Sequence, residues 1–346
     1  MRPPAHRRCA LAGTVALAFL PAARAPAAAP PAAPAPAPPA TPAPAPAPGL
    51  APAPALDPPS CAVIRMSTPG WSDLEVTDDV SALILKALGY RQHLDTLSVA
   101  ITYRALANGQ LDVFLGDWTP AHDSFTGPML AAHTLERLGQ NLSGAKYTLV
   151  VPDYVAAAGV RSFADLAKHG DQFGYQIYGI DEGSPGNQRI EAAVAGEGLE
   201  GWNVVSSSEQ GMLAQAARDI SRKRWIVFLG WEPHPMNLMF KLVYLSGGDK
   251  YFGPDYGGGR VYSVARAGFS QACPNAARLF RQLRFTVSTE DAVMQMTSTG
   301  GAAPADAARA YLVAHPELLA PWLEGVMTAD GRPGLAAVRS MLGITG

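Results

Sequence analysis

From Cys61 onward, the chain alternates short apolar runs with segments of helical period. The apolar runs have the length of strands and are rich in β-branched and aromatic residues. We predict strands at Ala62–Met66, Leu97–Tyr103, Leu111–Leu115, Tyr147–Val151, Gln176–Ile180, Trp225–Leu229, Leu242–Leu245 and Val261–Ala265. Strands that alternate with helices are typical of an α/β fold built on a parallel sheet.

Helical period is clearest in two of the intervening segments. In the first, one face is shared by Val80, Leu83, Ile84 and Leu88. Ser207 and Gln210 have the spacing of a capping box at the head of a second helix, Met212 to Ile220. We predict that the chain from Pro274 to its end is almost entirely helical.

The first residues have the pattern of an export signal. Arginines precede an apolar stretch from Cys9 to Leu20 without acidic residues, and small residues follow it. Residues 1–27 are therefore predicted to be a signal peptide, cleaved after Ala25 or Ala27. The alternative, a membrane anchor, needs about 20 apolar residues, and this run is shorter. We expect a periplasmic protein.

Residues 28–60 are predicted to form a disordered linker. From Pro26 to Ala55 the chain is Ala and Pro except at three positions, a composition that cannot build a core and favours extended chain. The whole sequence holds 27 Lys and Arg against 29 Asp and Glu, and four of the arginines lie in residues 1–27. A mildly acidic body without a basic run argues against a nucleic-acid partner and against anionic membrane surfaces.

Cys61 and Cys273 are the two cysteines beyond the export signal. In an oxidising compartment two cysteines predict a disulfide. Closing so long a loop is worth on the order of 5 kcal/mol in the chain-entropy description. The alternative is a pair of buried thiols.

The body is large for a single core, which predicts two lobes. A bond between Cys61 and Cys273 would place both ends of the body in one lobe. We therefore assign residues 61–143 plus 236–346 to lobe 1 and residues 144–235 to lobe 2. Two crossings between lobes make a hinge with a crevice, which is how ligand-trapping receptors close.

The sequence contains no familiar catalytic motif. It lacks a Gly-x-Ser-x-Gly elbow, a His-Glu-x-x-His pair, a phosphate loop and a dinucleotide fingerprint. The histidines are scattered, which supports neither a metal site nor a cofactor. His234, between two prolines, is interpreted as a structural or solvent-facing ring. We therefore expect that the protein is not an enzyme.

Three tryptophans occupy matching positions. Trp71, Trp118 and Trp231 each come just after an apolar run, and a glycine lies one or two residues before each. Open α/β sheets bind ligands beyond the carboxyl ends of their strands. A quaternary ammonium group has no hydrogen-bond donor, so aromatic faces and dispersion must hold it, and Trp is the best ring for this purpose. A lone Trp there is more often a packing residue, but three together favour a ligand cage.

The sequence resembles the choline and glycine betaine binding proteins of bacterial ABC importers, and most closely the choline-binding branch. The resemblance extends from about Cys61 to the C-terminus. It rests on Pro-Gly-Trp-Ser-Asp at 69–73, Leu-Asp-Val-Phe-Leu-Gly-Asp-Trp at 111–118, Gly-Ala-Lys-Tyr at 144–147, Ser-Ser-Glu-Gln-Gly-Met-Leu at 207–213 and Gly-Trp-Glu-Pro-His-Pro-Met at 230–236. It implies a two-lobed, type II-like periplasmic-binding-protein fold with a hinge and the ligand in the interlobe cleft.

The resemblance also implies the binding residues. An aromatic box for the trimethylammonium group would consist of Trp71, Trp118, Tyr147 and Trp231, of which Tyr147 is nominated by the resemblance alone. The polar end of the ligand would meet Asp73 and Asn187, although the loop Asp181–Asn187 differs in length from the usual pattern. Cys61 and Cys273 match the family's disulfide.

Asp73 favours choline over glycine betaine. A carboxylate can accept a hydrogen bond from the hydroxyl of choline, whereas it would repel the carboxylate of betaine. The Trp-bearing loops contain no Lys or Arg that could hold a carboxylate. The alternative interpretation of Asp73 is a helix N-terminal or turn residue without ligand contact.

Other functions stay open at this point. They are a glycine betaine or carnitine receptor of the same type, an enzyme that acts on a small quaternary amine, and a receptor that signals instead of transporting. For a transport protein, the expected partners are the small ligand and an ABC permease in the inner membrane. We expect a monomer.

Overall fold

The computed structural model describes residues 56–344. The predicted signal peptide and nearly all of the predicted linker lie outside these residues. Within them, strands form at β1 (Val63–Thr68), β2 (Arg91–Thr96), β3 (Val113–Thr119), β4 (Leu135–Pro152), β5 (Gln176–Tyr178), β6 (Asn203–Val205), β7 (Phe228–Glu232), β8 (Leu242–Tyr244) and β9 (Gly259–Arg266).

Helices lie in the connections between the strands and form most of the chain after β9, so the predicted α/β class is confirmed. The region from Pro274 onward is less helical than predicted, because residues 283–286, 299–303 and 323–333 lie outside helices. They are α1 (Ser72–Leu88), α2 (Val99–Ala107), α3 (Asp123–Ala131), α4 (Asp153–Ala157), α5 (Phe163–Leu166), α6 (Gly170–Phe173), α7 (Pro185–Gly196), α8 (Glu209–Ser221), α9 (Met236–Met239), α10 (Asp249–Phe252), α11 (Pro254–Gly257), α12 (Phe269–Ala272), α13 (Pro274–Gln282), α14 (Val287–Ser298), α15 (Pro304–Ala314), α16 (Leu319–Trp322) and α17 (Gly334–Leu342). Two short 3-10 turns occur at Pro59–Cys61 and Pro316–Leu318. None of the helices in the described part of the chain is long and apolar enough to cross a membrane.

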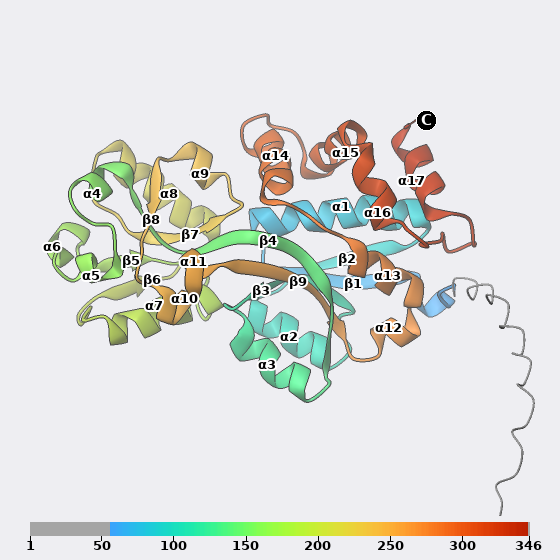
Figure 1. Ribbon diagram of the computed structural model, residues 1–346, viewed down its shortest axis with the longest axis horizontal. Helices are drawn as coiled ribbons and strands as arrows, with labels where there is room; N and C mark the ends of the chain where they lie inside the picture. Colours follow the sequence, from blue (N-terminus) through green and yellow to red (C-terminus); the bar gives the residue numbers. More distant parts are fainter. Residues whose placement is uncertain (1–55, 345–346) are drawn as a thin grey trace, which may run out of the picture. The chain divides into compact units, whose positions relative to one another are not determined.

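The sheet has two halves that share one long strand. Its order is β2-β1-β3-β9-β4-β7-β5-β6, and β8 also pairs with β4. β4 pairs with β9 through residues 135–145 and with β7 through residues 146–150, so it runs from one half into the other (Figure 1). The prediction of a parallel sheet is wrong for this central region, because β4 is antiparallel to β7, β8 and β9, and β3 is antiparallel to β9. The outer pairs β1/β2 and β5/β6 are parallel.

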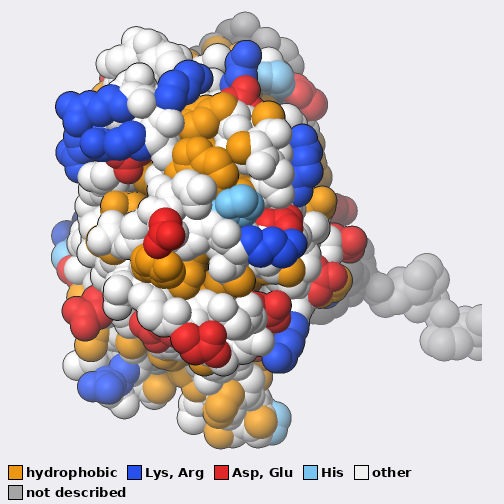
Figure 2. All heavy atoms as spheres, turned by 90° about the vertical axis from the view of Figure 1, so that its left-hand side faces the viewer, with side chains coloured by type: hydrophobic (Ala, Val, Ile, Leu, Met, Phe, Trp, Pro, Cys, Tyr) orange, Lys and Arg blue, Asp and Glu red, His pale blue; other side chains and the backbone are white. Residues whose placement is uncertain are grey.

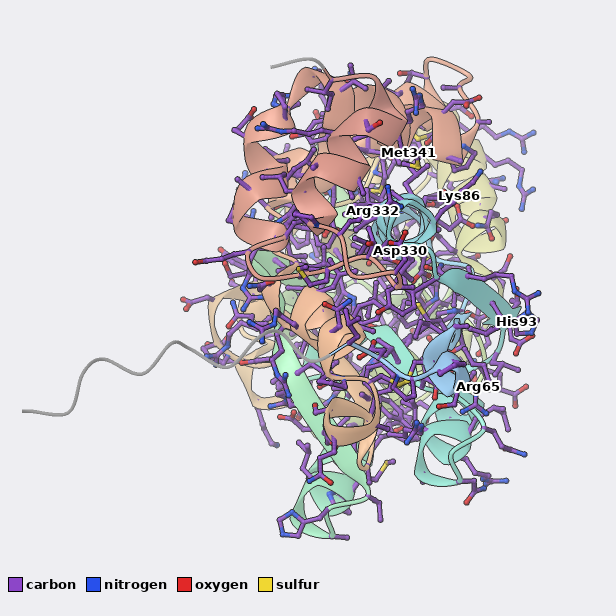
Figure 3. The ribbon with its side chains drawn as sticks, turned by 90° about the vertical axis from the view of Figure 1, so that its right-hand side faces the viewer. Arg65, Lys86, His93, Asp330, Arg332 and Met341 are labelled. Atoms are coloured by element: carbon purple, nitrogen blue, oxygen red, sulfur yellow. A yellow bond between two sulfur atoms is a disulfide. The ribbon has the colours of Figure 1, made fainter. Side chains whose placement is uncertain are left out.

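Helices cover both faces of the first half of the sheet. α1 and the C-terminal helices α14 to α17 lie on one face, and α2 and α3 lie on the other (Figure 1). α1 buries Val80, Ile84 and Leu88 of the predicted face, whereas Leu83 is only partly buried. The helix is capped by Gly89, whose φ of 89° suits glycine. At the far edge, Arg65 of β1 and His93 of β2 are register partners and lie on the outside (Figure 3).

Three local predictions differ from the structure. Leu97–Tyr103 is not a strand, because α2 begins at Val99. The buried residues of α2 follow helical spacing, and they are Val99, Thr102, Tyr103, Ala105 and Leu106. The side chain of Ile101, in contrast, is 44% exposed. The cap of α8 is Ser208, whose hydroxyl accepts from the backbone N–H of Gly211 at 3.1 Å, so the capping-box prediction was one residue early. β2, β6 and the first part of β4 were not predicted.

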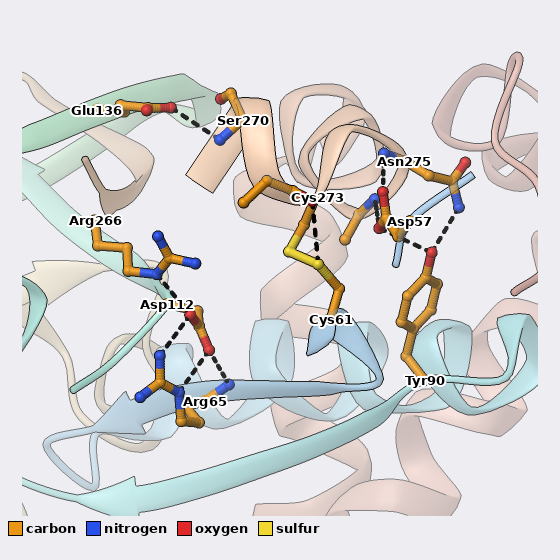
Figure 4. The surroundings of a disulfide bond; sticks show 12 residues. Asp57, Cys61, Arg65, Tyr90, Asp112, Glu136, Arg266, Ser270, Cys273 and Asn275 are labelled. Carbon is orange, nitrogen blue, oxygen red and sulfur yellow. Dashed lines mark hydrogen bonds and ion pairs between the residues drawn. A yellow bond between two sulfur atoms is a disulfide. The ribbon is translucent and has the colours of Figure 1, made fainter. Parts of the chain in front are cut away.

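The structure joins the beginning and the end of the body through a disulfide. Cys61 and Cys273 are bonded, as predicted, with their Cα atoms 5.9 Å apart (Figure 4). Beside them, the carboxylate of Asp57 accepts bonds from the backbone N–H groups of Asn275 and Ala276, at 2.7 and 2.9 Å. Asp57 therefore belongs to the folded body, although the sequence assigned it to the linker.

The second half of the sheet also includes the segment after β7. β8 pairs with residues 150–152 of β4 on the side opposite β7, because Val150 pairs with both strands, and the chain returns to the first half only with β9. The lobe boundary predicted at residues 235/236 therefore falls inside this half of the sheet. On the face of this half shown in Figure 2, basic, acidic and hydrophobic side chains are interspersed.

Candidate functional site

A buried cavity lies where the two halves of the sheet meet. It is lined by Trp71, Asp73, Trp118, His122, Tyr147, Ile180 and Trp231. The lining thus combines the predicted aromatic box and Asp73 with two residues, His122 and Ile180, that the sequence analysis did not select.

The four box residues come from different elements. Trp71 precedes α1, Trp118 and Trp231 lie near the ends of β3 and β7, and Tyr147 lies in β4. The rings of Trp118 and Tyr147 are 5.6 Å apart between centroids, and those of Tyr147 and Trp231 are 6.5 Å apart. Trp71 lies 6.2 Å from the ring of His122. All four side chains are buried, with at most 7% of any of them exposed.

Gly186 lets α7 approach Tyr147 closely. A Cβ at this position would lie 2.3 Å from the hydroxyl oxygen of Tyr147 and 2.6 Å from a methyl group of Leu229. Any side chain there would displace the tyrosine ring. The first turn of α7 therefore fixes the position of one wall of the cavity.

Asp73 contributes a buried carboxylate. It is the second residue of α1, is 3% exposed, and accepts a hydrogen bond from Trp231 Nε1 at 3.3 Å. Burial and the neighbouring Glu209 carboxylate raise the pKa of Asp73 to about 7, although His234 and Trp231 oppose the shift. A cation placed in the cavity would favour the charged form of this carboxylate.

A bridge of hydrogen bonds lies behind Asp73. Glu209, at the start of α8, accepts from the backbone N–H of Ser72 at 3.1 Å and from its hydroxyl at 2.5 Å. His234 Nδ1 accepts from the backbone N–H of Met236, so His234 Nε2 carries the proton and donates to Glu209 at 3.0 Å. His234 is thus buried, and its structural interpretation agrees with its contacts. The bridge links the first half of the sheet to the second.

Asn187 does not line the cavity. Its amide oxygen accepts from the backbone N–H of Ile180 at 2.9 Å, and its amide nitrogen donates to the Ile180 carbonyl at 2.7 Å and to Ser206 at 2.9 Å. Both N–H bonds of the side chain are therefore used within the protein. Asn187 fixes Ile180, which itself lines the cavity.

His122 could have been found from the sequence. It lies four residues after Trp118 in the same strand-end loop, at the residue that precedes α3. A histidine so close to a predicted box residue is the sequence signal for its place in the cavity lining. Ile180 offers no such signal, because an apolar residue at a strand end is ordinary.

No metal site is apparent near the cavity. Within residues 56–344, no group of three or more His, Cys, Asp and Glu side chains is placed to hold a metal ion. The polar groups that reach the cavity are a carboxylate, an imidazole and a phenol, surrounded by rings. Such a lining can enclose a small organic cation.

Comparison with known proteins gives a consistent result. A family model described as the substrate-binding domain of an ABC-type glycine betaine transport system matches residues 62–314. A curated relative from Listeria monocytogenes, the glycine betaine/carnitine transport binding protein GbuC, is 27% identical over 47% of this chain and 53% of its own length. An uncharacterised protein of Chromohalobacter salexigens is 47% identical over 37% of this chain and 83% of its own length.

Solved structures of similar proteins cover most of the chain. An ABC-transporter choline binding protein in complex with choline is 45% identical, with a TM-score of 0.81 over 83% of this chain and 100% of that one. Lactococcal OpuAC in complex with glycine betaine is 25% identical, with a TM-score of 0.68 over 75% of this chain and 98% of that one. The expected periplasmic-binding-protein fold, with two lobes and a ligand cleft, is thereby confirmed.

Proposed function

Because the chain belongs to the family of substrate-binding domains of ABC-type glycine betaine transport systems, we propose that it captures choline in this cavity. In this proposal the periplasmic protein closes its two lobes around the ligand and delivers it to an inner-membrane permease. The observation that carries the proposal is the set of four aromatic rings around a buried carboxylate. Family membership supports transport, and the cavity supports the choice of ligand.

The box accounts for binding of the ammonium group. The cavity is lined by the aromatic rings of Trp71, Trp118, Tyr147 and Trp231, which can attract a cation that offers no hydrogen-bond donor. Each desolvated ring can add about 2 kcal/mol of attraction. Asp73 adds a negative charge that attracts the ammonium group. Because Asp73 is buried, this attraction is screened less than it would be in water. A trimethylammonium group satisfies both features.

The polar lining favours choline over betaine. Among the described residues, neither Lys nor Arg lines the cavity, so a ligand carboxylate would have no cation to pair with. It would also face the carboxylate of Asp73. A hydroxyl group meets neither obstacle, because it can donate a hydrogen bond to an acceptor. For Asn187 we propose an indirect role, in which it positions Ile180 against the ligand.

Glycine betaine is the second candidate. Its support is the family description together with Trp71 Nε1, a buried donor without a hydrogen-bond partner among the described residues. A ligand carboxylate could accept from such a donor. One donor does not offset the charge of Asp73, so we rank betaine below choline.

The test is a calorimetric titration of the protein from residue 56 to its end with choline and with glycine betaine. We expect choline to bind tightly and betaine to bind more weakly by about tenfold or more. A tenfold difference corresponds to a repulsion of about 1.4 kcal/mol between the betaine carboxylate and Asp73. Preference for betaine would overturn the role of Asp73. Absence of binding to both would overturn the choice of ligand class.

A further inference from the structure

The ring of Trp118 lies against a glycine. A Cβ added at Gly259, the first residue of β9, would lie 3.2 and 3.3 Å from two carbons of the six-membered ring of Trp118. It would also lie 3.1 Å from the Cβ of Ala145. Contacts this short require a neighbour to move by a few tenths of an ångström. The absence of a side chain at Gly259 therefore makes room for the indole.

The backbone of Gly259 gives no other reason for a glycine at this position. Its φ lies outside the left-handed region that favours glycine. A glycine weakens a strand, because it has no side chain to pack, and it often marks a place where another group approaches closely. At Gly259, which is buried, this group is the indole of Trp118.

Trp118 and Gly259 share one face of the sheet. Trp118 is the register partner of Val261, which lies two residues after Gly259 in β9, and Ala145 is the register partner of Gly259 itself. Opposed residues, and residues two apart in a strand, point to the same face. The sheet thus lies on one side of the indole and the cavity on another. A methyl group at position 259 would lift the ring off the sheet and toward the cavity.

The neighbouring ring of the box is held by the same segment of the chain. The rings of Trp118 and Tyr147 are 5.6 Å apart between centroids. A Cβ at Gly257, whose φ is 83°, would lie 2.1 Å from the carbonyl oxygen of Tyr147. Residues 257–259 therefore pack against the backbone of Tyr147 and against the ring of Trp118. The spacing between the two rings depends on both contacts.

The spacing of the rings decides which ammonium groups the box can hold. An aromatic ring attracts a cation when the charge lies within about 6 Å of the ring centroid. A closely packed site that is made narrower has to distort in order to accept an added methylene group. A shift of Trp118 toward the cavity would therefore weaken the binding of a larger head group more than that of a smaller one.

We propose that Gly259 is a positioning residue that sets the width of the aromatic box, and thereby the size of the quaternary ammonium group that the protein accepts. The inference rests on the proposed function, since it assumes that the box holds such a group. Gly259 does not line the cavity, so it acts through Trp118. The roles proposed for the residues of the box and for Asp73 stay as they are.

The test compares choline with the analogue in which one N-methyl group is replaced by N-ethyl, so that the charge and the hydroxyl group stay the same. Calorimetry on Gly259→Ala should show choline bound more weakly by about tenfold and the analogue by about fiftyfold, because the extra methylene group meets a narrower box. The ratio of the two affinities is the decisive result, since a general loss of stability would not change it. An unchanged ratio, or a ratio that moves in favour of the analogue, would overturn the inference.

A double variant shows whether the effect passes through Trp118. Trp118→Phe removes the outer part of the indole, which Gly259 faces. In this background Gly259→Ala should change the ratio of affinities by less than about twofold. A ratio that changes equally in both backgrounds would overturn the inference. If Gly259→Ala alone does not fold, Trp118→Phe should restore folding, and failure to restore it would also overturn the inference.

Gly127→Ala is the matched control. Gly127 lies in α3 with a φ outside the left-handed region, and a Cβ there would have no neighbour within 4 Å among the described residues outside its own helix. Both affinities should stay as in the wild type. If the wild type binds neither ligand, the proposed function fails and the inference fails with it. If it binds choline and Gly259→Ala leaves the ratio unchanged, the inference alone fails.

Discussion

Ser72 and Glu209 are joined by two hydrogen bonds, from the backbone N–H and from the hydroxyl of the serine to the two oxygens of the carboxylate. Ser72 begins α1 on the first half of the sheet, and Glu209 begins α8 on the second. The same carboxylate accepts from His234. A single side chain thus ties together the two elements that carry Asp73 and Trp231.

Ser72→Ala should weaken choline binding by favouring the open arrangement. The variant loses a hydroxyl bond to a charged group, worth about 1.5–3 kcal/mol, and affinity falls with the population of the closed form. We expect a loss of about tenfold by calorimetry and a larger radius of gyration of the free protein in X-ray scattering. Ser221→Ala, at the exposed far end of α8, is the control. Unchanged affinity in Ser72→Ala would show that the bridge does not influence closure.

Trp71→Ala and Trp118→Ala should each weaken choline binding by more than about tenfold, since a desolvated ring contributes about 2 kcal/mol. Fluorescence or calorimetric titration measures this loss. Trp202→Phe is the matched control, because Trp202 is buried against Phe173 and does not line the cavity. A loss under about twofold for Trp71→Ala would remove this ring from the site.

Affinity for choline should depend on pH through Asp73. In the free protein its pKa is about 7, so at lower pH a cation must displace a proton in order to bind. We expect the dissociation constant to rise between about pH 7 and pH 5, by up to about tenfold per pH unit. Asp73→Asn should bind more weakly at about pH 8 and lose this dependence. A dependence that survives in the variant would show that Asp73 is not its source.

The free protein should be more stable in mild acid than at alkaline pH. Burial raises the pKa values of Asp73, Asp78 and Glu290 above those of the unfolded chain. Between the unfolded and folded pKa values the native state binds more protons, so the free energy of unfolding falls as pH rises through that window. For Asp73 the window runs from 3.8 to about 7.

Thermal melting at about pH 5.5 and at about pH 8 measures this difference. Asp78→Asn should reduce it, because both carboxylate oxygens of Asp78 are buried without a hydrogen-bond partner among the described residues. Saturating choline should also reduce it, since the ligand favours the charged form of Asp73. A melting temperature that rises with pH would contradict the assignment of these carboxyl groups as protonated.

Removal of the disulfide should destabilise the protein without altering the cavity. A variant with Cys61→Ser and Cys273→Ser should lose about 2–5 kcal/mol of unfolding free energy in urea titrations. Neither residue lines the cavity, so the affinity for choline at low denaturant should be retained. Loss of binding in a folded double variant would show that the N-terminal strand influences the site.

The sequence predicted those parts of the site that depend on strand ends. Trp71, Trp118 and Trp231 follow apolar runs, and the sheet brings these strand ends together. Tyr147 lies inside a long strand, where nothing local marks it, and only the resemblance to a family nominated it. His122 was missed although it lies four residues after Trp118, because the motifs on which the resemblance rests end at Trp118.

The central strands were harder to predict for a physical reason. The first part of β4, residues 135–145, is polar and irregular in its pairing with β9, with register shifts at three places. Its apolar period is therefore interrupted, and single-sequence patterns do not detect it. The direction of β4 and β9, which makes the sheet mixed, depends on contacts between segments more than one hundred residues apart.

The changeover of β4 from β9 to β7 has a mechanical consequence. Ala145 is the last residue paired with β9, Lys146 is the first paired with β7, and Tyr147 follows directly. A ring of the box therefore lies directly at the changeover, so a change in the angle between the two halves of the sheet would also change the distances between the rings. In the proposed function, a cation that draws the rings together would also change this angle.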